Sequence, residues 1–173
     1  FSLAKKRLRN INAWDDYAAI PLGTTILTDH HGNEKKRSPM PGDFIRLRLP
    51  GPGPSSGEGF DWVRIECIED LSQPHGESEI FFMQVRPSNN PTNNRNEIAH
   101  IFSEEATNTF IIERNGNSVS ASVLGRNEMP NTHSKNVTGK IRNVAVATGS
   151  ALGLSYAKWK QLVVAIINGK GDD

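Results

Sequence analysis

Alternating apolar and polar residues mark the middle of the chain and predict a series of β-strands. In residues 43–49, Ile45 and Leu47 alternate with Arg46 and Arg48, which gives one apolar and one basic face. The same two-residue period recurs in residues 62–69, 80–86, 107–114 and 118–124, and weaker patterns predict short strands at 24–28 and 98–102. These segments predict a strand-rich body over residues 24–125.

The dipeptide Asn115-Gly116 separates two of these strands and predicts a tight β-hairpin, since both residues tolerate the positive φ that a two-residue turn requires. A turn centred on this dipeptide places Ile112 opposite Val119. One face of the hairpin is then apolar, and the other carries hydroxyl side chains. We expect the apolar face to meet the core.

Two loops rich in turn-forming residues lie between the predicted strands. Residues 50–59 hold three prolines and four glycines, and residues 87–96 hold five asparagines and two prolines. Such compositions oppose the formation of helices and of strand ladders. We therefore expect both segments to be exposed surface loops.

Apolar residues at helical spacing mark both ends of the chain. Residues 1–20 predict an N-terminal helical segment, although no clear cap is present. An apolar stripe in residues 137–145 predicts one further helix, and Ser155 is placed to cap a second one that contains Trp159. Together they predict a C-terminal helical segment over residues 135–168.

These elements predict a single α+β domain over residues 1–173. A mainly antiparallel curved sheet, or a partly open β-barrel, forms the body in this prediction, and the C-terminal helices pack on it. A chain of this length buries enough apolar surface for one core and does not need two. The pattern does not specify the strand order.

The charge balance of the chain argues against a strong overall electric field. Twenty basic and nineteen acidic residues give a net charge of +1, so any attraction to nucleic acid or anionic lipid must be local. The longest aliphatic run, residues 162–167, has six residues, far below the roughly 20 needed to span a bilayer. We therefore expect a soluble protein without a membrane span.

The single cysteine, Cys67, cannot form an internal disulfide, which slightly favours a reducing, cytoplasmic location. Its position on the apolar side of the predicted strand at 62–69 indicates an inert core residue. Residues 1–12 lack the apolar stretch of an intact secretory signal, and secretion after removal of a signal stays open as an alternative.

If the strand at 43–49 pairs with the strand at 62–69, the face opposite the core gathers arginines beside aromatic residues. The predicted ligand-binding residues of this face are Arg46, Arg48, Trp62, Arg64 and Arg86, with Phe44 and Phe82 nearby. Guanidinium groups beside exposed rings suit a phosphate, a carboxylated ligand or a single-stranded nucleic acid. The alternative is structural, because outward residues of a one-sided sheet are polar in any case and a helix could cover the rings.

A second candidate site is a polar loop that follows the predicted hairpin. It contains Arg126, Asn127, Glu128, Asn131 and His133, whose hydrogen-bonding groups suit a polar ligand. In the structural alternative, Asn131 supports a turn, and Arg126 and Glu128 pair in solvent. The same loop supplies an enzyme hypothesis, in which Arg126, Glu128 and His133 act on a small anionic substrate.

The sequence lacks recognisable cofactor and metal motifs. Asp29, His31, His100, Glu128 and His133 are residue types that bind zinc or iron, but their spacing matches no metal-binding motif. No GxSxG nucleophile elbow and no phosphate-binding P-loop is present in the sequence. We therefore expect no cofactor and no metal site.

The leading functional hypothesis is a non-enzymatic binding or interaction module that recognises an anionic ligand or partner through the arginine and aromatic face. A small enzyme with a pocket between sheet and helices is the first alternative. A structural subunit that buries Phe44, Trp62 and Phe82 in an oligomer is the second. The ligand or protein partner is not specified, nucleic acid is less favoured, and a homo-oligomer is compatible with the sequence.

Overall fold

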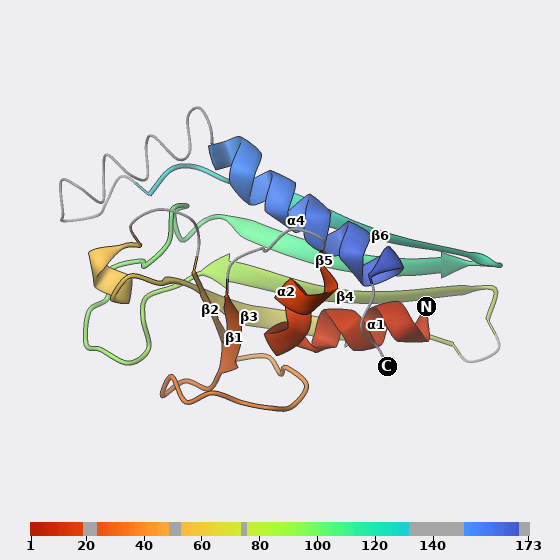
Figure 1. The fold of residues 1–173 in the computed structure, drawn as a ribbon, viewed down its shortest axis with the longest axis horizontal. Helices are drawn as coiled ribbons and strands as arrows, with labels where there is room; N and C mark the ends of the chain where they lie inside the picture. The colour runs from red at the N-terminus through yellow and green to blue at the C-terminus, as the bar shows by residue number, and fades with distance from the viewer. Residues whose placement is uncertain (19–23, 49–52, 74–75, 132–150, 170–173) are drawn as a thin grey trace.

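A six-stranded antiparallel sheet forms the body of the protein (Figure 1). The computed structural model describes residues 1–18, 24–48, 53–73, 76–131 and 151–169. The strands are β1 (Thr25–Thr28), β2 (Phe44–Leu47), β3 (Asp61–Asp70), β4 (Ser78–Pro87), β5 (Thr107–Asn115) and β6 (Ser118–Arg126). Each strand pairs with its neighbour in sequence, so the sheet has two edges, β1 and β6, and does not close into a barrel. The predicted α+β fold with an antiparallel sheet is confirmed.

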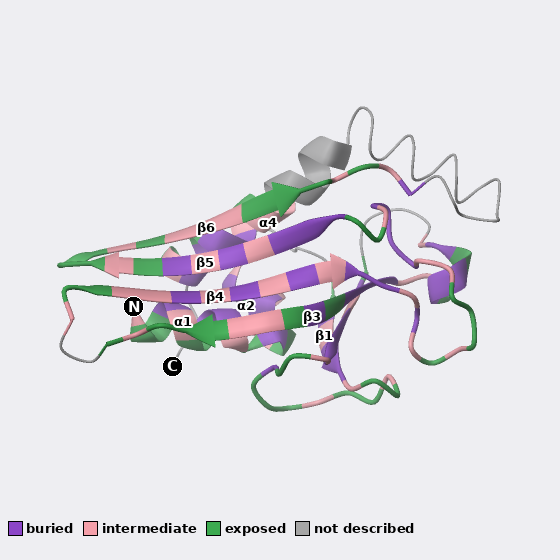
Figure 2. Ribbon diagram, turned by 180° about the vertical axis from the view of Figure 1, so that it is seen from behind, coloured by how far each residue is buried: buried purple, intermediate pink, exposed green. Residues whose placement is uncertain are grey.

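The helices that complete the core lie on one face of this sheet. They are α1 (Ser2–Arg9), the 3-10 helix η1 (Ile11–Ala13), α2 (Trp14–Tyr17) and α4 (Ala151–Asn168). Figure 1 views the molecule from the helix side, and Figure 2 shows the opposite face, over which no described helix lies. A further 3-10 turn, η2 (Ser55–Gly57), lies in the loop between β2 and β3. The predicted packing of a C-terminal helix on the sheet is confirmed for α4.

The N-terminal segment forms several short helices instead of one. Helix α1 ends at Asn10, whose φ of −94° and ψ of 69° fall outside the helical region. After this break, α2 begins with Trp14, which is fully buried. The Trp14 ring centroid lies 5.7 Å from that of Phe110 in β5 and 6.2 Å from that of Trp159 in α4. These three rings therefore hold α2 and α4 against the sheet.

Arg7 connects α1 to the C-terminal end of α4. Its guanidinium donates from Nη1 to the carbonyls of Ile166 at 3.1 Å and Ile167 at 3.3 Å, and from Nη2 to the carbonyl of Gly169. Carbonyl groups in the last turn of a helix have no backbone partner within the helix. A cation at this end also complements the helix dipole. Arg7 thus acts as a C-terminal cap supplied by another helix.

The hairpin of β5 and β6 differs in register from the prediction by two residues. Its turn consists of Gly116 and Asn117, and Ile112 pairs with Ala121 rather than with Val119. Gly116 adopts a positive φ of 57°, as a type II′ turn requires at its first central position. A shift by two residues keeps each side chain on its predicted face, so the apolar face still meets the core.

A β-bulge in β3 overturns the predicted position of Cys67. Ile65 pairs with Val85 of β4, but Cys67 pairs with the adjacent residue Gln84, so β3 has one extra residue at this point. The extra residue exchanges the two faces of the strand beyond the bulge. Ile68 consequently packs against the core, whereas Cys67 is half-buried on the opposite face.

The remaining differences concern the boundaries of elements. Residues 98–102 form single bridges to neighbouring segments rather than a strand. Helix α4 begins at Ala151, so Ser155 lies inside the helix rather than at its cap. The predicted helical stripe at residues 137–145 lies outside the described residues.

Candidate functional site

The pairing of β2, β3 and β4 brings the predicted arginine face together. Arg46 pairs with Trp62, and Arg64 pairs with Phe44 on one side and with Arg86 on the other. Directly paired residues project from the same side of a sheet. These side chains therefore share the face opposite the helix layer.

The aromatic part of this face is not exposed, which corrects the expectation of a stacking surface. Trp62 is only 2% exposed and Phe44 only 9%. Both belong to a small cluster with Ala99, and the indole Nε1 of Trp62 donates to the carbonyl of Gly57 at 3.3 Å. The segment predicted as an exposed loop, residues 50–59, is partly buried where it is described, because Gly57 lies against the indole and Phe60, directly after the segment, packs on the same cluster. A loop rather than a helix covers the rings, which leaves them unavailable to a ligand or to an oligomer interface.

Two arginines of this face lie on neighbouring strands but differ in their partners. Arg86 donates from Nε to a carboxylate oxygen of Glu66 at 2.5 Å and from Nη1 to the carbonyl of Glu104 at 2.8 Å. This ion pair neutralises Arg86. Arg64 is exposed and has no carboxylate partner among the described residues. Of the two, Arg64 alone has a positive charge that no carboxylate in the described part of the chain neutralises.

The other two predicted arginines stack on a single ring. The guanidinium carbons of Arg46 and Arg48 lie 4.9 Å and 5.5 Å from the centroid of the Phe60 ring, within the range of cation–π attraction. The Nε of Arg46 is buried, and no group in the described part of the chain accepts a hydrogen bond from it. Arg48 is exposed. We name Arg46, Arg48 and Arg64 the arginine cluster.

Two residues of the predicted polar loop make structural contacts. Asn131 is 3% exposed and donates from Nδ2 to the carbonyls of Ile98 at 3.0 Å and His100 at 3.1 Å. Glu128 accepts from the side-chain amide of Asn108 at 2.9 Å. These bonds tie the loop to the segment before β5 and to β5 itself.

The other residues of this loop do not assemble the acid and base groups of the enzyme hypothesis within the described part of the chain. Arg126 and Asn127 are exposed, and Asn127 adopts a positive φ of 52° just after β6. Arg126 forms no ion pair with Glu128, so the predicted pairing in solvent is wrong. His133 lies outside the described residues.

Other titratable groups are held by local structural contacts. Among the described residues, no three His, Cys, Asp or Glu side chains lie close enough to hold a metal ion. The Nδ1 of His100 accepts from the backbone N–H of Phe102 at 3.0 Å. Burial, followed by the nearby carboxylate of Glu69, raises the pKa of the Cys67 thiol. A raised pKa disfavours the thiolate that a nucleophile would need.

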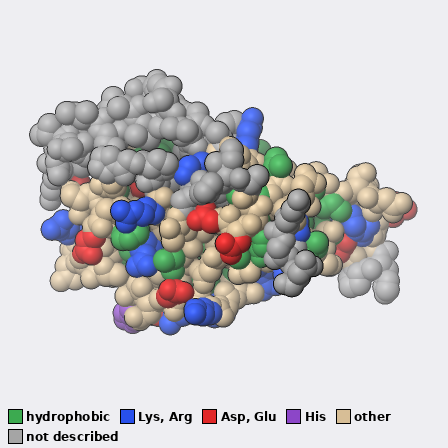
Figure 3. All heavy atoms as spheres, in the orientation of Figure 1, with side chains coloured by type: hydrophobic (Ala, Val, Ile, Leu, Met, Phe, Trp, Pro, Cys, Tyr) green, Lys and Arg blue, Asp and Glu red, His purple; other side chains and the backbone are tan. Residues whose placement is uncertain are grey.

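A groove that the sequence analysis did not predict lies between α1 and the loop that joins β1 to β2. Its volume is about 540 Å³. Its charged lining residues are Lys5, Lys6, Arg9, Lys36 and Arg37, together with one carboxylate, Glu34. We name it the basic groove. Basic and acidic side chains are interspersed on the helix-bearing face in Figure 3. The lining of the groove, with five cations and one carboxylate, is a local concentration of positive charge.

Two of the five cations in the basic groove are neutralised by carboxylates. The Nζ of Lys5 lies 2.8 Å from a carboxylate oxygen of Asp70, and the guanidinium of Arg37 forms a two-pronged pair with Asp43 at 2.6 Å and 2.9 Å. The bonds from Lys5 and from Ser72 lower the pKa of Asp70, and the bond to Asp43 raises the pKa of Arg37. These two pairs fix the walls of the groove.

The remaining three cations, Lys6, Arg9 and Lys36, have no carboxylate partner among the described residues. Arg9 is half-buried, and its Nε is buried without an acceptor from the described part of the protein. A buried donor without an acceptor is costly, and most such groups in folded proteins find a partner. The groove therefore holds one buried N–H donor without an acceptor, and three cations without a carboxylate partner, among the residues that the structure describes.

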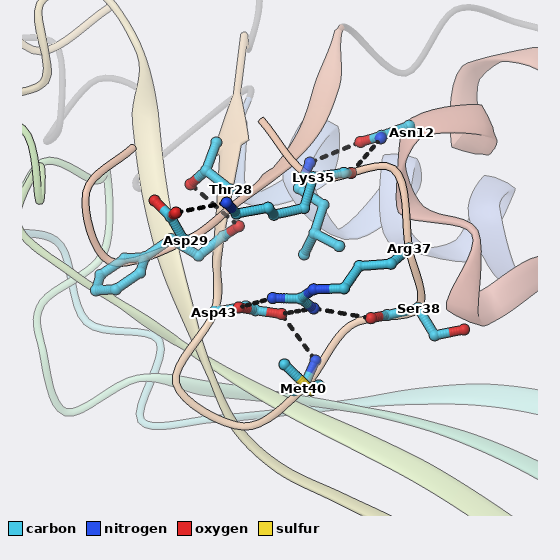
Figure 4. A network of polar contacts seen from close by, with 10 residues as sticks. Asn12, Thr28, Asp29, Lys35, Arg37, Ser38, Met40 and Asp43 are labelled. Atoms are coloured by element: carbon cyan, nitrogen blue, oxygen red, sulfur yellow. Dashed lines mark hydrogen bonds and ion pairs between the residues drawn. The ribbon is translucent and has the colours of Figure 1, made fainter. Parts of the chain in front are cut away.

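A polar network holds the loop that forms one wall of the basic groove (Figure 4). The Nζ of Lys35 donates to a carboxylate oxygen of Asp29 at 2.7 Å, and this bond is the main reason that the pKa of Asp29 lies well below its usual range. The carbonyl of Lys35 accepts from the side-chain amide of Asn12 at 2.8 Å, which joins the loop to η1. The backbone N–H of Met40 donates to Asp43 at 2.9 Å. The loop therefore presents Lys36 from an ordered backbone.

Two clusters of basic residues in the sequence contribute to this groove, but they lie far apart along the chain. Lys5, Lys6 and Arg9 cluster within the first helix, and residues 35–37 form a run of three basic residues. Either signal alone is typical of a solvated charged face. Only the packing of α1 beside the loop between β1 and β2 places them on one cavity.

Comparisons with known proteins add no family to this description. No protein-family model, no curated protein and no solved structure gives a match to this chain. In the described part of the chain, none of the helices is long and apolar enough to cross a membrane.

Proposed function

We propose that the protein is a non-enzymatic binding module for a small ligand with more than one anionic group, held in the basic groove. One observation carries this proposal: Lys6, Arg9 and Lys36 line a single groove without carboxylate partners among the described residues. The buried Nε of Arg9 adds a donor that lacks an acceptor there. A phosphate or carboxylate oxygen would supply both the negative charge and the acceptor.

The lining chemistry favours anionic groups over an apolar ligand. A guanidinium binds phosphate or carboxylate through two parallel hydrogen bonds, whereas an ammonium acts as a compact point charge. Arg9 belongs to α1 and Lys36 to the facing loop, so a ligand that contacts both needs an anionic group near each wall. The volume of about 540 Å³ falls within the range of about 300–1,000 Å³ that is usual for small-molecule sites.

Calorimetric titration with pyrophosphate and with citrate at low ionic strength tests this proposal. Arg9→Gln and Lys36→Gln should each weaken binding by about tenfold or more, because a hydrogen bond to a charged group contributes about 1.5–3 kcal/mol. Arg126→Gln is the matched control, since it removes one positive charge from an exposed position outside the groove. Added salt should weaken the binding of the wild type.

Two results would contradict the basic groove as the binding site. The first is a wild-type protein that binds neither probe at low salt. The second is an equal loss of affinity in Arg126→Gln, because that result would indicate attraction to the overall charge of the protein. Circular dichroism of each variant separates loss of binding from loss of the fold.

The arginine cluster supports a second candidate, an extended anionic partner bound on the open face of the sheet. Arg48 and Arg64 are exposed without carboxylate partners among the described residues, and Arg46 has a buried Nε without an acceptor there. Arg48→Gln with Arg64→Gln tests this site in the same titration. Loss of binding in this double variant, with Arg9→Gln unaffected, would move the proposal to the arginine cluster. Single-stranded nucleic acid is the less favoured partner because the rings that would stack on bases, Trp62 and Phe44, are buried.

A further inference from the structure

The outer edge of β6 carries a row of backbone groups that no other described residue pairs with. Asn115 and Ser118 flank a two-residue turn, so they form a hydrogen-bonded pair, and such pairs recur at every second position of the hairpin. The intervening residues direct their N–H and C=O groups away from β5. They are Val119, Ala121, Val123 and Gly125, which we name the edge residues. In the described part of the chain, no backbone or side-chain group bonds to their outward backbone atoms.

The opposite edge of the sheet is partly covered by described residues, in contrast to the edge at β6. In β1, the N–H of Leu27 donates to the side-chain oxygen of Asn12 at 2.7 Å, and its carbonyl accepts from the N–H of Lys35 at 2.8 Å. A single bridge also joins Thr28 to Glu34. Asn12, Thr28 and Lys35 are visible together in Figure 4. The chain thus covers part of the short edge strand with η1 and a loop, whereas described residues leave the outer edge of the long strand β6 uncovered.

The sequence of β6 lacks the usual features that prevent pairing between edge strands. Natural edge strands are protected by charged residues, proline, bulges or short length. Residues 118–125 contain neither a charge nor a proline, and the pairing of β6 with β5 is continuous over the nine residues 118–126. Helix α4 packs on the inner side of this strand, against the side chains of Val119, Ala121 and Val123. That packing does not engage the outward backbone atoms, which lie in the plane of the sheet.

We propose that β6 pairs antiparallel with β6 of a second copy of this chain, about a two-fold axis at Ser122. This register places Val119 opposite Gly125 of the other copy and Ala121 opposite Val123, and the two-fold axis repeats both pairings. All four edge residues of each copy are then satisfied, with roughly eight backbone hydrogen bonds, two for each pair. The two sheets become one continuous sheet.

The side chains of this arrangement favour a second copy over an unrelated strand. On the open face, Ser122 meets Ser122, and Ser120 meets Leu124, whose side chain is 49% exposed in the single chain. No like charges oppose one another within the paired segment, because Arg126, the only charged residue of β6, lies opposite Ser118. The strand is thus complementary to itself without any change of conformation.

A charge-swap experiment tests the pairing. Sedimentation or light scattering of the wild type should give the mass of a dimer that dissociates on dilution, over a range of about 1 to 100 µM. Ser122→Lys and Ser122→Asp each place like charges opposite one another across the axis, so each variant alone should be monomeric. An equimolar mixture of the two variants should recover the dimer. Ser78→Lys, an exposed substitution in β4, is the matched control and should remain dimeric.

Hydrogen exchange supplies an independent readout of the same edge. The amides of the edge residues should be protected in the wild-type dimer and should exchange quickly in Ser122→Lys. The proposal is overturned by a wild type that is monomeric throughout the dilution series, or by a dimer that neither Ser122 variant affects. It is also overturned if the edge amides stay protected in a monomer, because another part of the chain would then occupy the edge. The pairing of β6 does not depend on ligand binding in the basic groove, so a failure of either proposal leaves the other unaffected.

Discussion

Replacement of Arg7 by methionine tests whether this side chain caps the C-terminal end of α4. The Arg7 side chain is 5% exposed, and its guanidinium donates to the carbonyls of Ile166, Ile167 and Gly169 at the end of α4. It also lies 5.7 Å from the ring centroid of Tyr17. Methionine retains most of the apolar stem and removes every donor, so the carbonyls lose their partner while the packing is largely kept.

The magnitude follows from the number and type of bonds lost at Arg7. A hydrogen bond from a charged donor contributes about 1.5–3 kcal/mol, and a cation at a partly buried helix C-terminus contributes up to about 2 kcal/mol. The cost of burying the guanidinium offsets part of this sum. We therefore expect Arg7→Met to lower the free energy of unfolding by about 2–4 kcal/mol, a large share of the usual 5–15 kcal/mol.

Urea unfolding followed by circular dichroism measures this loss. For an m-value of about 2 kcal/mol per molar, the midpoint should fall by about 1–2 M without a change in slope. Arg9→Met is the matched control, because Arg9 lies on the same helix and makes no hydrogen bond to the described residues. It should not lower the free energy of unfolding, because it removes a buried Nε donor that has no acceptor among the described residues. A loss below about 1 kcal/mol in Arg7→Met, or an equal loss in Arg9→Met, would refute the assignment of Arg7 as the cap of α4.

Three further predictions concern a thiol, an ion pair and a turn. Burial is the main cause of the raised pKa of the Cys67 thiol, and the carboxylate of Glu69 is the next. Glu69→Gln removes that charge, so alkylation of Cys67 by iodoacetamide should become at least about twofold faster. An unchanged rate would contradict this role of Glu69. Lys35→Met should raise the pKa of Asp29, measured by NMR titration. Because the folded pKa of Asp29 is depressed, its stabilising contribution is present above pH 3.8 and is lost at lower pH, so the wild type should lose more stability than Lys35→Met on acidification below that value. Gly116→Ala places a side chain at a φ of 57° and should cost about 1–2 kcal/mol, and an unchanged melting temperature would argue against the observed turn.

Local patterns in the sequence determined the secondary structure of the strand-rich body and its fold class. The two-residue period in residues 80–86 and 107–114 specifies which side chains face the core, and this information survives an error of register by two residues because such a shift preserves the faces. The hairpin of β5 and β6 illustrates that tolerance, because its register differs from the prediction by two residues and its apolar face is the predicted one. Helical spacing likewise identified α4 as a helix that packs on the sheet.

Tertiary structure alone decided the positions that depend on contacts between distant segments. The extra residue in β3 moved Cys67 to the other face, because a bulge is a property of the pairing with β4 and not of either strand alone. Trp62 became buried because a glycine-rich loop folds back over it. The basic groove exists because α1 packs beside a loop that lies some 30 residues away in sequence. Periodicity records which side of its own element a residue occupies, whereas a binding surface depends on which elements become neighbours, and that is settled only when the whole chain packs.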